Sequence, residues 1–156
     1  GKDTWYAPAV RRAAAASGAG ERIRFLGFVS DDELLMLYNA CDFFIFPSFY
    51  EGFGLPVVEA MACGTPVACS NVSACPEVAD AAALFFDPCS GAEIKRAMAD
   101  LIFDNELRTR IGRLGLSRAS HFSWRKTAES TLAIYQEVAG CRRAPRASAR
   151  AASLAS

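Results

Sequence analysis

Short apolar runs alternate along the chain with longer segments in which apolar residues recur at helical spacing. The runs predict strands at 23–28, 43–46, 66–69 and 83–86. The longer segments predict helices at 6–17, 31–40, 55–63, 91–103, 105–117 and 124–139, with a helical turn at 76–79. Strands that alternate with helices indicate an α/β fold with a parallel sheet and flanking helices.

Helix-start signals sharpen three of these boundaries. Ser30 with Glu33 and Ser90 with Glu93 have the spacing of a capping box, in which serine and glutamate bond to each other's backbone amide groups. Ser123 is expected to cap the last helix.

Glycines indicate one helix end and one weak helix. Gly64 is expected to close the helix at 55–63 in a left-handed conformation. Gly112 and Gly115 are expected to weaken the helix at 105–117, because glycine has a low helix propensity. In the first helix, Tyr6 and Val10 are expected on the buried side.

Composition excludes several classes of function. The 156 residues carry no formal net charge and are 52% hydrophobic, which suits one domain with a substantial core. No basic motif interleaved with aromatic residues points to nucleic acid, so we expect no nucleic-acid partner. No apolar run is long enough to span a membrane and no signal peptide is recognisable, so we expect a cytoplasmic protein.

The six cysteines form no Cys-x-x-Cys pair and one histidine accompanies them, so we expect no zinc site. Small buried thiols in a reducing compartment are the favoured interpretation, with disulfides as the alternative. The predicted strands and helices fall within one domain at 1–140, and residues 141–156, rich in Arg, Ala and Ser, predict a disordered tail. Its four arginines could contact an anionic membrane surface, and a solvated tail is the alternative.

The stretch at 46–66 joins a predicted buried strand to a helix through a loop that contains Gly52 and Gly54. The helix begins at Leu55-Pro56, where the missing amide group of proline costs nothing. A strand, a glycine loop and a helix N-terminus predict an anion-binding site, because the amide groups of the first helical turn and the helix dipole point at the ligand.

Two carboxylates frame this loop. Glu51 lies on it, and Glu59 follows after seven intervening residues. A carboxylate repels a phosphate but accepts hydrogen bonds from hydroxyl groups, so the pair points to a nucleotide sugar, with phosphates between two polyols. The alternative is that both glutamates complement the helix dipole.

Other residues have two interpretations. Ser70, Asn71 and Ser73 follow a strand at its carboxyl end and could reach a ligand or serve a turn. His121 is expected in a surface or capping role rather than in catalysis, and Glu77 is expected to complement a helix dipole. Three aromatic side chains could wall the pocket or pack beneath the loop: Phe49, Tyr50 and Phe53.

The stretch with the two glutamates resembles the E-x7-E motif of the group 1 family of retaining glycosyltransferases, which have the GT-B fold. The similarity extends to 23–29, 70–78, 83–88 and 122–128, and covers nearly all of 1–139. The resemblance implies a Rossmann-like parallel sheet that forms the C-terminal, donor-binding half of such an enzyme. Because that half has six strands in the family, we expect this chain to be a fragment without the acceptor domain, the first strands and the cationic pair that holds the diphosphate.

The resemblance also implies a role for each residue of the site. Glu51 would bond to hydroxyl groups of the donor sugar, and it is the candidate catalytic residue, as a stabilising group in preference to a covalent nucleophile. Glu59 would hold the ribose hydroxyl groups. Amide groups of the loop would line the sugar and the diphosphate, and an earlier turn would lie beside the nucleobase. The loop residues are Gly52, Phe53, Gly54 and Leu55, and the turn residues are Gly27, Phe28 and Val29.

The implied reaction transfers a glycosyl unit from a nucleotide-diphosphate sugar to an acceptor hydroxyl with retention, and needs neither a metal nor another cofactor. The segment 70–73 resembles mannosyltransferases that use GDP-mannose. The acceptor would be a glycan or lipid-linked glycan in polysaccharide biosynthesis, bound by the absent domain at the inner face of the membrane. Two alternatives are a non-catalytic nucleotide-sugar-binding or interaction module of the same fold, and a truncated, partly unfolded product.

Overall fold

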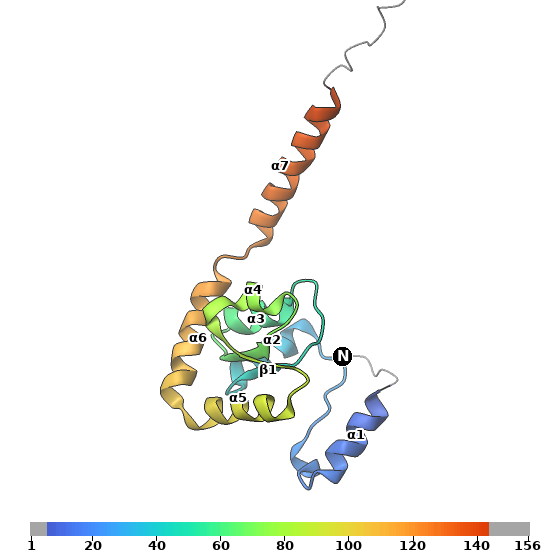
Figure 1. The fold of residues 1–156 in the computed structure, drawn as a ribbon, viewed down its shortest axis with the longest axis vertical. Coiled ribbons are helices and arrows are strands. Elements are labelled where there is room, and N and C mark those ends of the chain that lie inside the picture. Colours follow the sequence, from blue (N-terminus) through green and yellow to red (C-terminus); the bar gives the residue numbers. More distant parts are fainter. Residues whose placement is uncertain (1–5, 144–156) are drawn as a thin grey trace, which may run out of the picture. The chain divides into compact units, whose positions relative to one another are not determined.

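The computed structural model describes residues 6–143, and the chain divides into two compact units at Ala119 and Ser120. The first unit holds the sheet and six α-helices (Figure 1). The second unit, as far as it is described, holds the helix α7 (Trp124–Arg143) and the residues that lead into it. Each unit is described by itself.

The sheet of the first unit is parallel. It consists of β1 (Phe44–Phe46), β2 (Val67–Ser70) and β3 (Ala83–Phe86), in the order β1-β2-β3. Ala68 of β2 lies opposite Ile45 on one side and Leu84 on the other. The predicted α/β class with a parallel sheet is therefore confirmed.

The strand predicted at 23–28 is wrong. This segment follows a short 3-10 helix, η1 (Gly20–Arg22), and pairs with no strand among the described residues. An extended segment becomes a strand only when its backbone groups pair with a neighbour, and the apolar residues here lack that partner. The centroid of the Phe25 ring instead lies 4.6 Å from the guanidinium carbon of Arg11, and Phe28 is 82% exposed.

The helices agree with the sequence pattern to within a few residues. They are α1 (Ala7–Ala16), α2 (Asp31–Ala40), α3 (Leu55–Ala62), α4 (Cys75–Ala79), α5 (Gly91–Phe103) and α6 (Asn105–Ala119), with the 3-10 turn η2 (Asp80–Ala82) after α4. Helix α1 has no buried residue, so Tyr6 and Val10 do not form the buried side that its pattern predicted.

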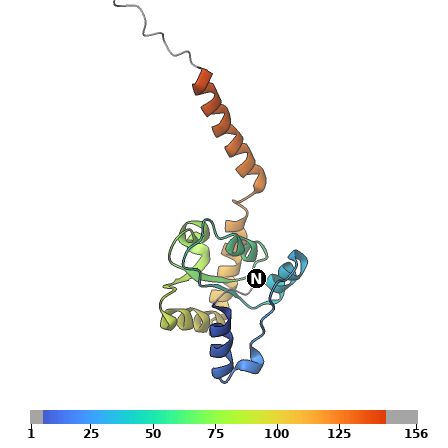
Figure 2. The ribbon, with the colours of Figure 1, turned by 90° about the vertical axis from the view of Figure 1, so that its right-hand side faces the viewer.

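Helices cover both faces of the sheet. Ala68 and Phe86 pack with Ala97 and Leu101 of α5 in one buried cluster. The helices α3 and α4 lie on the opposite side (Figure 1), and the turned view again shows them across the sheet from α5 (Figure 2). Alternate side chains of β2 therefore enter two apolar layers, which explains why all of its residues are buried.

Gly112 and Gly115 lie where α6 packs closely on α3 and on the residues that follow it. A Cβ atom at Gly112 would lie 2.6 Å from the carbonyl oxygen of Gly64, and one at Gly115 would lie 3.2 Å from Cγ of Met61. Both glycines are buried at the contact between α6 and α3, where the absence of a side chain permits the close approach. Gly64 has φ of +74°, as its predicted left-handed cap requires.

The first capping box is confirmed and the second is altered. Ser30 and Glu33 bond to each other's amide groups over 2.8 and 3.3 Å. Ser90 accepts the amide hydrogen of Glu93 over 3.2 Å, but the Glu93 carboxylate accepts from the amide of Asp87 instead. The amide of Ser90 donates to the Asp87 carbonyl. The bond from the Ser90 amide to the Glu93 carboxylate, which a capping box requires, is therefore replaced by a bond within the loop before α5.

Helix α7 begins after Ser123, whose hydroxyl accepts the amide hydrogen of Lys126 over 3.2 Å, as predicted. It extends to Arg143, so the first residues of the predicted tail are helical, and 144–156 lie outside the described residues. Every described helix is too short or too polar to cross a membrane. The predicted burial of cysteines holds for Cys69 and Cys75, which are free thiols, whereas Cys41 and Cys89 are exposed.

Candidate functional site

The candidate site lies where the carboxyl ends of β1 and β2 open into loops. The loop 47–54 runs from β1 to α3, and 71–74 runs from β2 to α4. Gly54, the last residue before α3, has φ of +91°, a conformation that favours glycine. The first turn of α3 therefore starts abruptly at Leu55, followed by Pro56, which has no amide hydrogen, and the amide of Val57 donates to the Gly54 carbonyl over 3.0 Å. The start of α3 keeps the positive end of its helix dipole towards the loop, which favours an anion there.

Both loops hold Glu51. The hydroxyl of Ser48 donates to Oε1 of Glu51 over 2.8 Å. From the second loop, Oγ of Ser73 accepts the amide hydrogen of Glu51 over 3.0 Å and donates to its carbonyl oxygen over 2.8 Å. Glu51 is half-buried, so its carboxylate is held by the Ser48 hydroxyl and is still accessible to a ligand.

Buried thiols form the floor beneath the glycine loop. A Cβ atom at Gly54 would lie 4.0 Å from Sγ of Cys75, which is 1% exposed. Burial, and then the charge of Glu51, raise the pKa of the Cys75 thiol. Burial, and then Cys75, raise the pKa of Cys69 to about 12. Both thiols are therefore neutral at physiological pH, and they present an apolar floor to the loop.

Glu59, in the second turn of α3, is oriented by Tyr38 of α2. The phenol hydroxyl donates to Oε2 of Glu59 over 3.4 Å. The Tyr38 ring meets Phe44 edge-on with centroids 5.3 Å apart, and its carbonyl accepts from the hydroxyl of Thr65 over 2.6 Å. Burial, and then the charge of Glu59, raise the pKa of Tyr38 to about 12, so the phenol stays a donor.

A hollow of about 340 Å³ lies beside Glu59. Its lining comes from α2 and α3, and it is mostly apolar: Asp31, Leu34, Leu35, Tyr38, Glu59, Ala62 and Cys63. This volume lies within the range of small-molecule pockets. A carboxylate at the edge of an apolar hollow suits a ligand with hydroxyl groups next to a flat apolar surface.

The turn 27–29 precedes Ser30 and Asp31 at the start of α2, and Asp31 lines the hollow, whereas no residue of the turn does. Gly27 has φ of +69°, Phe28 is strongly exposed and Val29 is half-buried. Glu59 thus lines the hollow, whereas the predicted nucleobase turn is connected to it only along the chain, through the start of α2. Glu51 lies outside the lining of the hollow.

The structure separates the two interpretations for several further residues. The Ser70 hydroxyl is fully buried and donates to the carbonyl of Phe46 over 3.4 Å, so it serves the sheet. Ser73 serves the loop through Glu51. The aromatic side chains do not pack beneath the loop, because they are 67%, 83% and 41% exposed at Phe49, Tyr50 and Phe53. His121 is exposed in the second unit.

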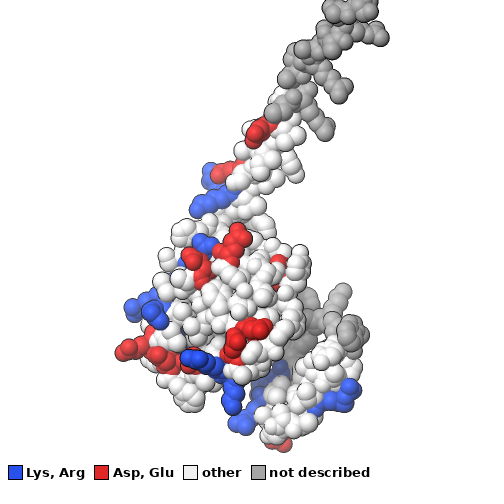
Figure 3. All heavy atoms as spheres, viewed as in Figure 1, with Lys and Arg blue, Asp and Glu red and all other residues white. Residues whose placement is uncertain are grey.

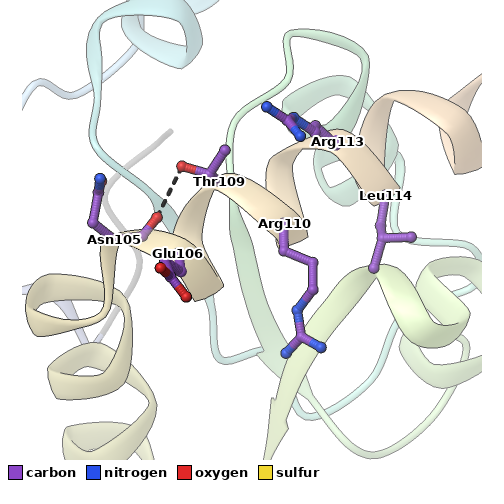
Figure 4. A pocket seen from close by; sticks show the side chains of 6 residues that line it. All are labelled: Asn105, Glu106, Thr109, Arg110, Arg113 and Leu114. Atoms are coloured by element: carbon purple, nitrogen blue, oxygen red, sulfur yellow. Dashed lines mark hydrogen bonds between the residues drawn. The ribbon is translucent and has the colours of Figure 1, made fainter.

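A second hollow, of about 490 Å³, lies along α6. All six lining residues come from this one helix, and the hydroxyl of Thr109 donates to the Asn105 carbonyl (Figure 4). No glycine loop or strand end contributes to this lining. On the face seen in Figure 3, acidic and basic side chains are interspersed, in keeping with the formal net charge of zero.

Three contributors to the site were missed in the sequence. Tyr38 carries a weak signal in the sequence, because a buried phenol usually requires a hydrogen-bond partner. Ser48 sits three residues before Glu51, a spacing at which a hydroxyl can reach a side chain locally. Cys75 carried no signal, because only the three-dimensional packing brings it under Gly54.

A family model described as "Glycosyl transferases group 1" matches residues 8–118. The O-antigen chain mannosyltransferase B of Escherichia coli is 44% identical over 114 residues, which make up 73% of this chain and 30% of the relative. The serotype-specific mannosyltransferase WbdA of Escherichia coli is 40% identical over 104 residues, 67% of this chain and 13% of the relative. The chain thus spans less than a third of the length of either relative.

Solved structures show the same fold. Sucrose-phosphate synthase from Thermosynechococcus elongatus superposes with a TM-score of 0.81 at 26% identity, covering 90% of this chain and 37% of the other. The C-terminal domain of the group 1 glycosyl transferase LpcC from Francisella tularensis gives 0.67 at 29% identity, covering 74% and 61%. HepE of Anabaena in complex with UDP-glucose gives 0.74 at 24% identity, covering 85% and 37%, and that likeness concerns the fold alone.

The matched region runs from the first helix through α6 and includes both loops that hold Glu51. It also includes α2 and α3, whose side chains line the hollow beside Glu59. The chain therefore belongs to the group 1 family of glycosyl transferases.

Proposed function

We propose that this chain binds the nucleotide-sugar donor of a retaining glycosyltransferase, and that the enzyme it forms part of transfers a hexosyl unit to a glycan hydroxyl. The observation that carries the proposal is the placement of Glu51 and Glu59 on either side of the N-terminus of α3. Glu51 is held from two loops, and Glu59 edges an apolar hollow. Two hydroxyl-accepting carboxylates with an anion-binding helix start between them match the chemistry of a sugar, a diphosphate and a nucleoside.

In this proposal each part of the site contacts a different part of the donor. The carboxylate of Glu51 accepts hydrogen bonds from the sugar, and the amide groups from Gly52 to Leu55 face the sugar and diphosphate. Glu59 accepts the ribose hydroxyl groups, and the hollow between α2 and α3 takes part of the nucleoside. The turn 27–29 would lie beside the nucleobase, as the resemblance implies. The roles of these residues follow the resemblance to the family motif together with the positions described above.

Catalysis would depend on stabilising charge. As the glycosidic bond to the diphosphate breaks, the sugar gains oxocarbenium character and the leaving phosphate gains negative charge. Aligned amide groups and the dipole of α3 would stabilise the leaving group, and Glu51 would stabilise the sugar without attacking it. No metal is required in this scheme. Attack by the acceptor from the face that the diphosphate leaves would retain the anomeric configuration.

The relatives favour mannose as the transferred sugar. Both Escherichia coli relatives are named mannosyltransferases, and one of them acts on the O-antigen chain. We propose GDP-mannose as the donor and a glycan or lipid-linked glycan as the acceptor. The acceptor would be bound by further segments of the protein, since this chain spans 30% of the mannosyltransferase B length. By itself the chain would bind the donor without turning it over.

An NMR titration of the chain with GDP, UDP and ADP tests the proposal. Shifts confined to 27–38 and 51–59, with one base preferred, are expected. Glu59→Ala should weaken nucleoside diphosphate binding by about tenfold or more, the factor expected for a hydrogen bond to a charged group. Glu51→Ala should leave nucleoside diphosphate binding unchanged and weaken binding of the nucleotide sugar. Equal binding of both ligands by both variants and the wild type would refute the assignment.

A further inference from the structure

Ser73 adopts a backbone conformation that its residue type disfavours. Its φ is +59°, in the left-handed region, and it lies in the loop between β2 and α4. Besides glycines, only Asp80 shares this property among the described residues, with φ of +50°. A non-glycine residue in this region costs free energy, so the surrounding structure must hold it there.

The contacts of Ser73 explain why the conformation is kept. Its one hydroxyl group both accepts the amide hydrogen of Glu51 over 3.0 Å and donates to the carbonyl oxygen of the same residue over 2.8 Å. A serine hydroxyl has one hydrogen to donate and lone pairs to accept with, so both bonds can exist together. Ser48 holds the carboxylate of Glu51 at the same time, over 2.8 Å. The main chain of Glu51 is therefore fixed by Ser73 of the loop 71–74, and its side chain is fixed by Ser48 of its own loop.

We propose that Ser73 is a positioning residue for the donor sugar, because it holds the Glu51 main chain and so fixes where the carboxylate meets the sugar. The inference rests on the proposed function, in which Glu51 accepts hydrogen bonds from sugar hydroxyl groups. A carboxylate must be held within a fraction of an ångström to bond to a sugar well, and a mobile loop would lose that geometry. The diphosphate and the nucleoside contact other groups, so Ser73 should matter little for them.

Ser73→Gly is the variant that tests this role. It removes the hydroxyl and leaves the left-handed backbone in a conformation that glycine adopts readily, so the fold should not suffer. Asp80→Gly is the matched control. It relieves a positive φ at the end of α4, and no described hydrogen bond links Asp80 to Glu51. Ser73→Ala, which removes the hydroxyl and keeps the strain, checks that any effect comes from the lost hydrogen bonds.

Amide hydrogen exchange tests the hydrogen bonds without any ligand. The exchange of the Glu51 amide should become about tenfold faster in Ser73→Gly and in Ser73→Ala, the factor expected when a hydrogen bond is lost. The Val57 amide, which donates to the Gly54 carbonyl over 3.0 Å, should keep its rate. Asp80→Gly should leave both rates unchanged. An unchanged Glu51 rate in the Ser73 variants would overturn the proposal.

Ligand titration of the same proteins separates positioning from a general structural role. In Ser73→Gly, affinity for GDP-mannose, or for UDP-glucose if UDP is the preferred nucleotide, should fall about tenfold, while affinity for the free diphosphate stays within twofold. A parallel loss of both affinities would show a structural role and overturn the proposal. If the wild-type chain binds neither ligand, the donor site itself fails, and with it the role of Ser73 in sugar binding. Faster exchange of the Glu51 amide would then show that the contact exists and that the proposed function was the part at fault.

Discussion

The buried phenol of Tyr38 holds the exposed carboxylate of Glu59. The oxygen atoms are 3.4 Å apart, and they join α2 to α3 at the edge of the apolar hollow. Tyr38 is itself fixed by the Phe44 ring and by the hydroxyl of Thr65. A residue of the core thus determines where a predicted ligand-binding carboxylate points.

We expect Tyr38→Phe to weaken nucleoside diphosphate binding. Without the phenol hydroxyl, Glu59 loses one fixed partner, and the affinity should fall about threefold to tenfold, less than in Glu59→Ala. Isothermal titration calorimetry measures the change. Tyr135→Phe, at an exposed tyrosine of α7, is the control and should bind as the wild type does. A folded Tyr38→Phe protein with wild-type affinity would show that Glu59 does not depend on this contact.

The raised pKa of Tyr38 predicts a stability change in the alkaline range. The phenol ionises at about 12 in the folded protein and at about 10 in the unfolded chain. Between these values the folded protein holds a proton that the unfolded chain has lost, so the free energy of unfolding must fall as pH rises. Below about pH 10 this group contributes no pH dependence.

Urea unfolding of the wild type and Tyr38→Phe from pH 9 to 12 measures this contribution by difference. The stability of the variant should fall less steeply above about pH 10. Cys69, whose pKa is raised to about 12, titrates in both proteins and therefore cancels. Parallel stability curves would mean that the phenol ionises equally in the folded and unfolded states.

Two glycines of the loop should respond differently to alanine. Gly54→Ala should destabilise the fold by about 1–2 kcal/mol, because φ is +91° there. Gly52 is not in the left-handed region and a Cβ atom there would meet open space, so Gly52→Ala should change stability by no more than about 0.5 kcal/mol. It should nonetheless weaken nucleotide-sugar binding, since the methyl group would occupy space that the ligand needs. Urea unfolding of both variants measures the stability change, and NMR titration measures binding of the nucleotide sugar. Unimpaired binding by Gly52→Ala would place the donor away from this loop.

The glycines of α6 provide a test of packing against helix propensity. Propensity alone predicts that Gly112→Ala stabilises the helix by about 1 kcal/mol. The contact with the Gly64 carbonyl, at 2.6 Å, predicts instead a loss of about 1–3 kcal/mol. Gly115→Ala, three residues further, is the matched comparison: its nearest neighbour is the flexible Met61 side chain at 3.2 Å, and its effect should be much smaller. A thermal melt of each variant decides, and a stabilised Gly112→Ala protein would contradict the close packing of α6.

Local signals in the sequence were reliable wherever the structure depends on near neighbours. The box of Ser30 and Glu33, the cap by Ser123 and the left-handed Gly64 all follow from bonds or backbone angles within a few residues. The second box failed in one bond, because Asp87 lies close enough to Glu93 to compete with Ser90. The segment 23–28 failed because a strand needs a paired neighbour, and its own residues cannot supply one.

The same distinction between local features and contacts distant in the sequence applies to the candidate site. The sequence by itself determined the α/β class, the loop with its helix start, and the identity and spacing of Glu51 and Glu59, because these depend on periodicity and on residues adjacent in the chain. Only the tertiary structure decided what holds the main chain of Glu51 and the carboxylate of Glu59. Ser73 and Tyr38 each lie more than twenty residues from the glutamate that they contact, and such pairs form only when strands and helices pack together.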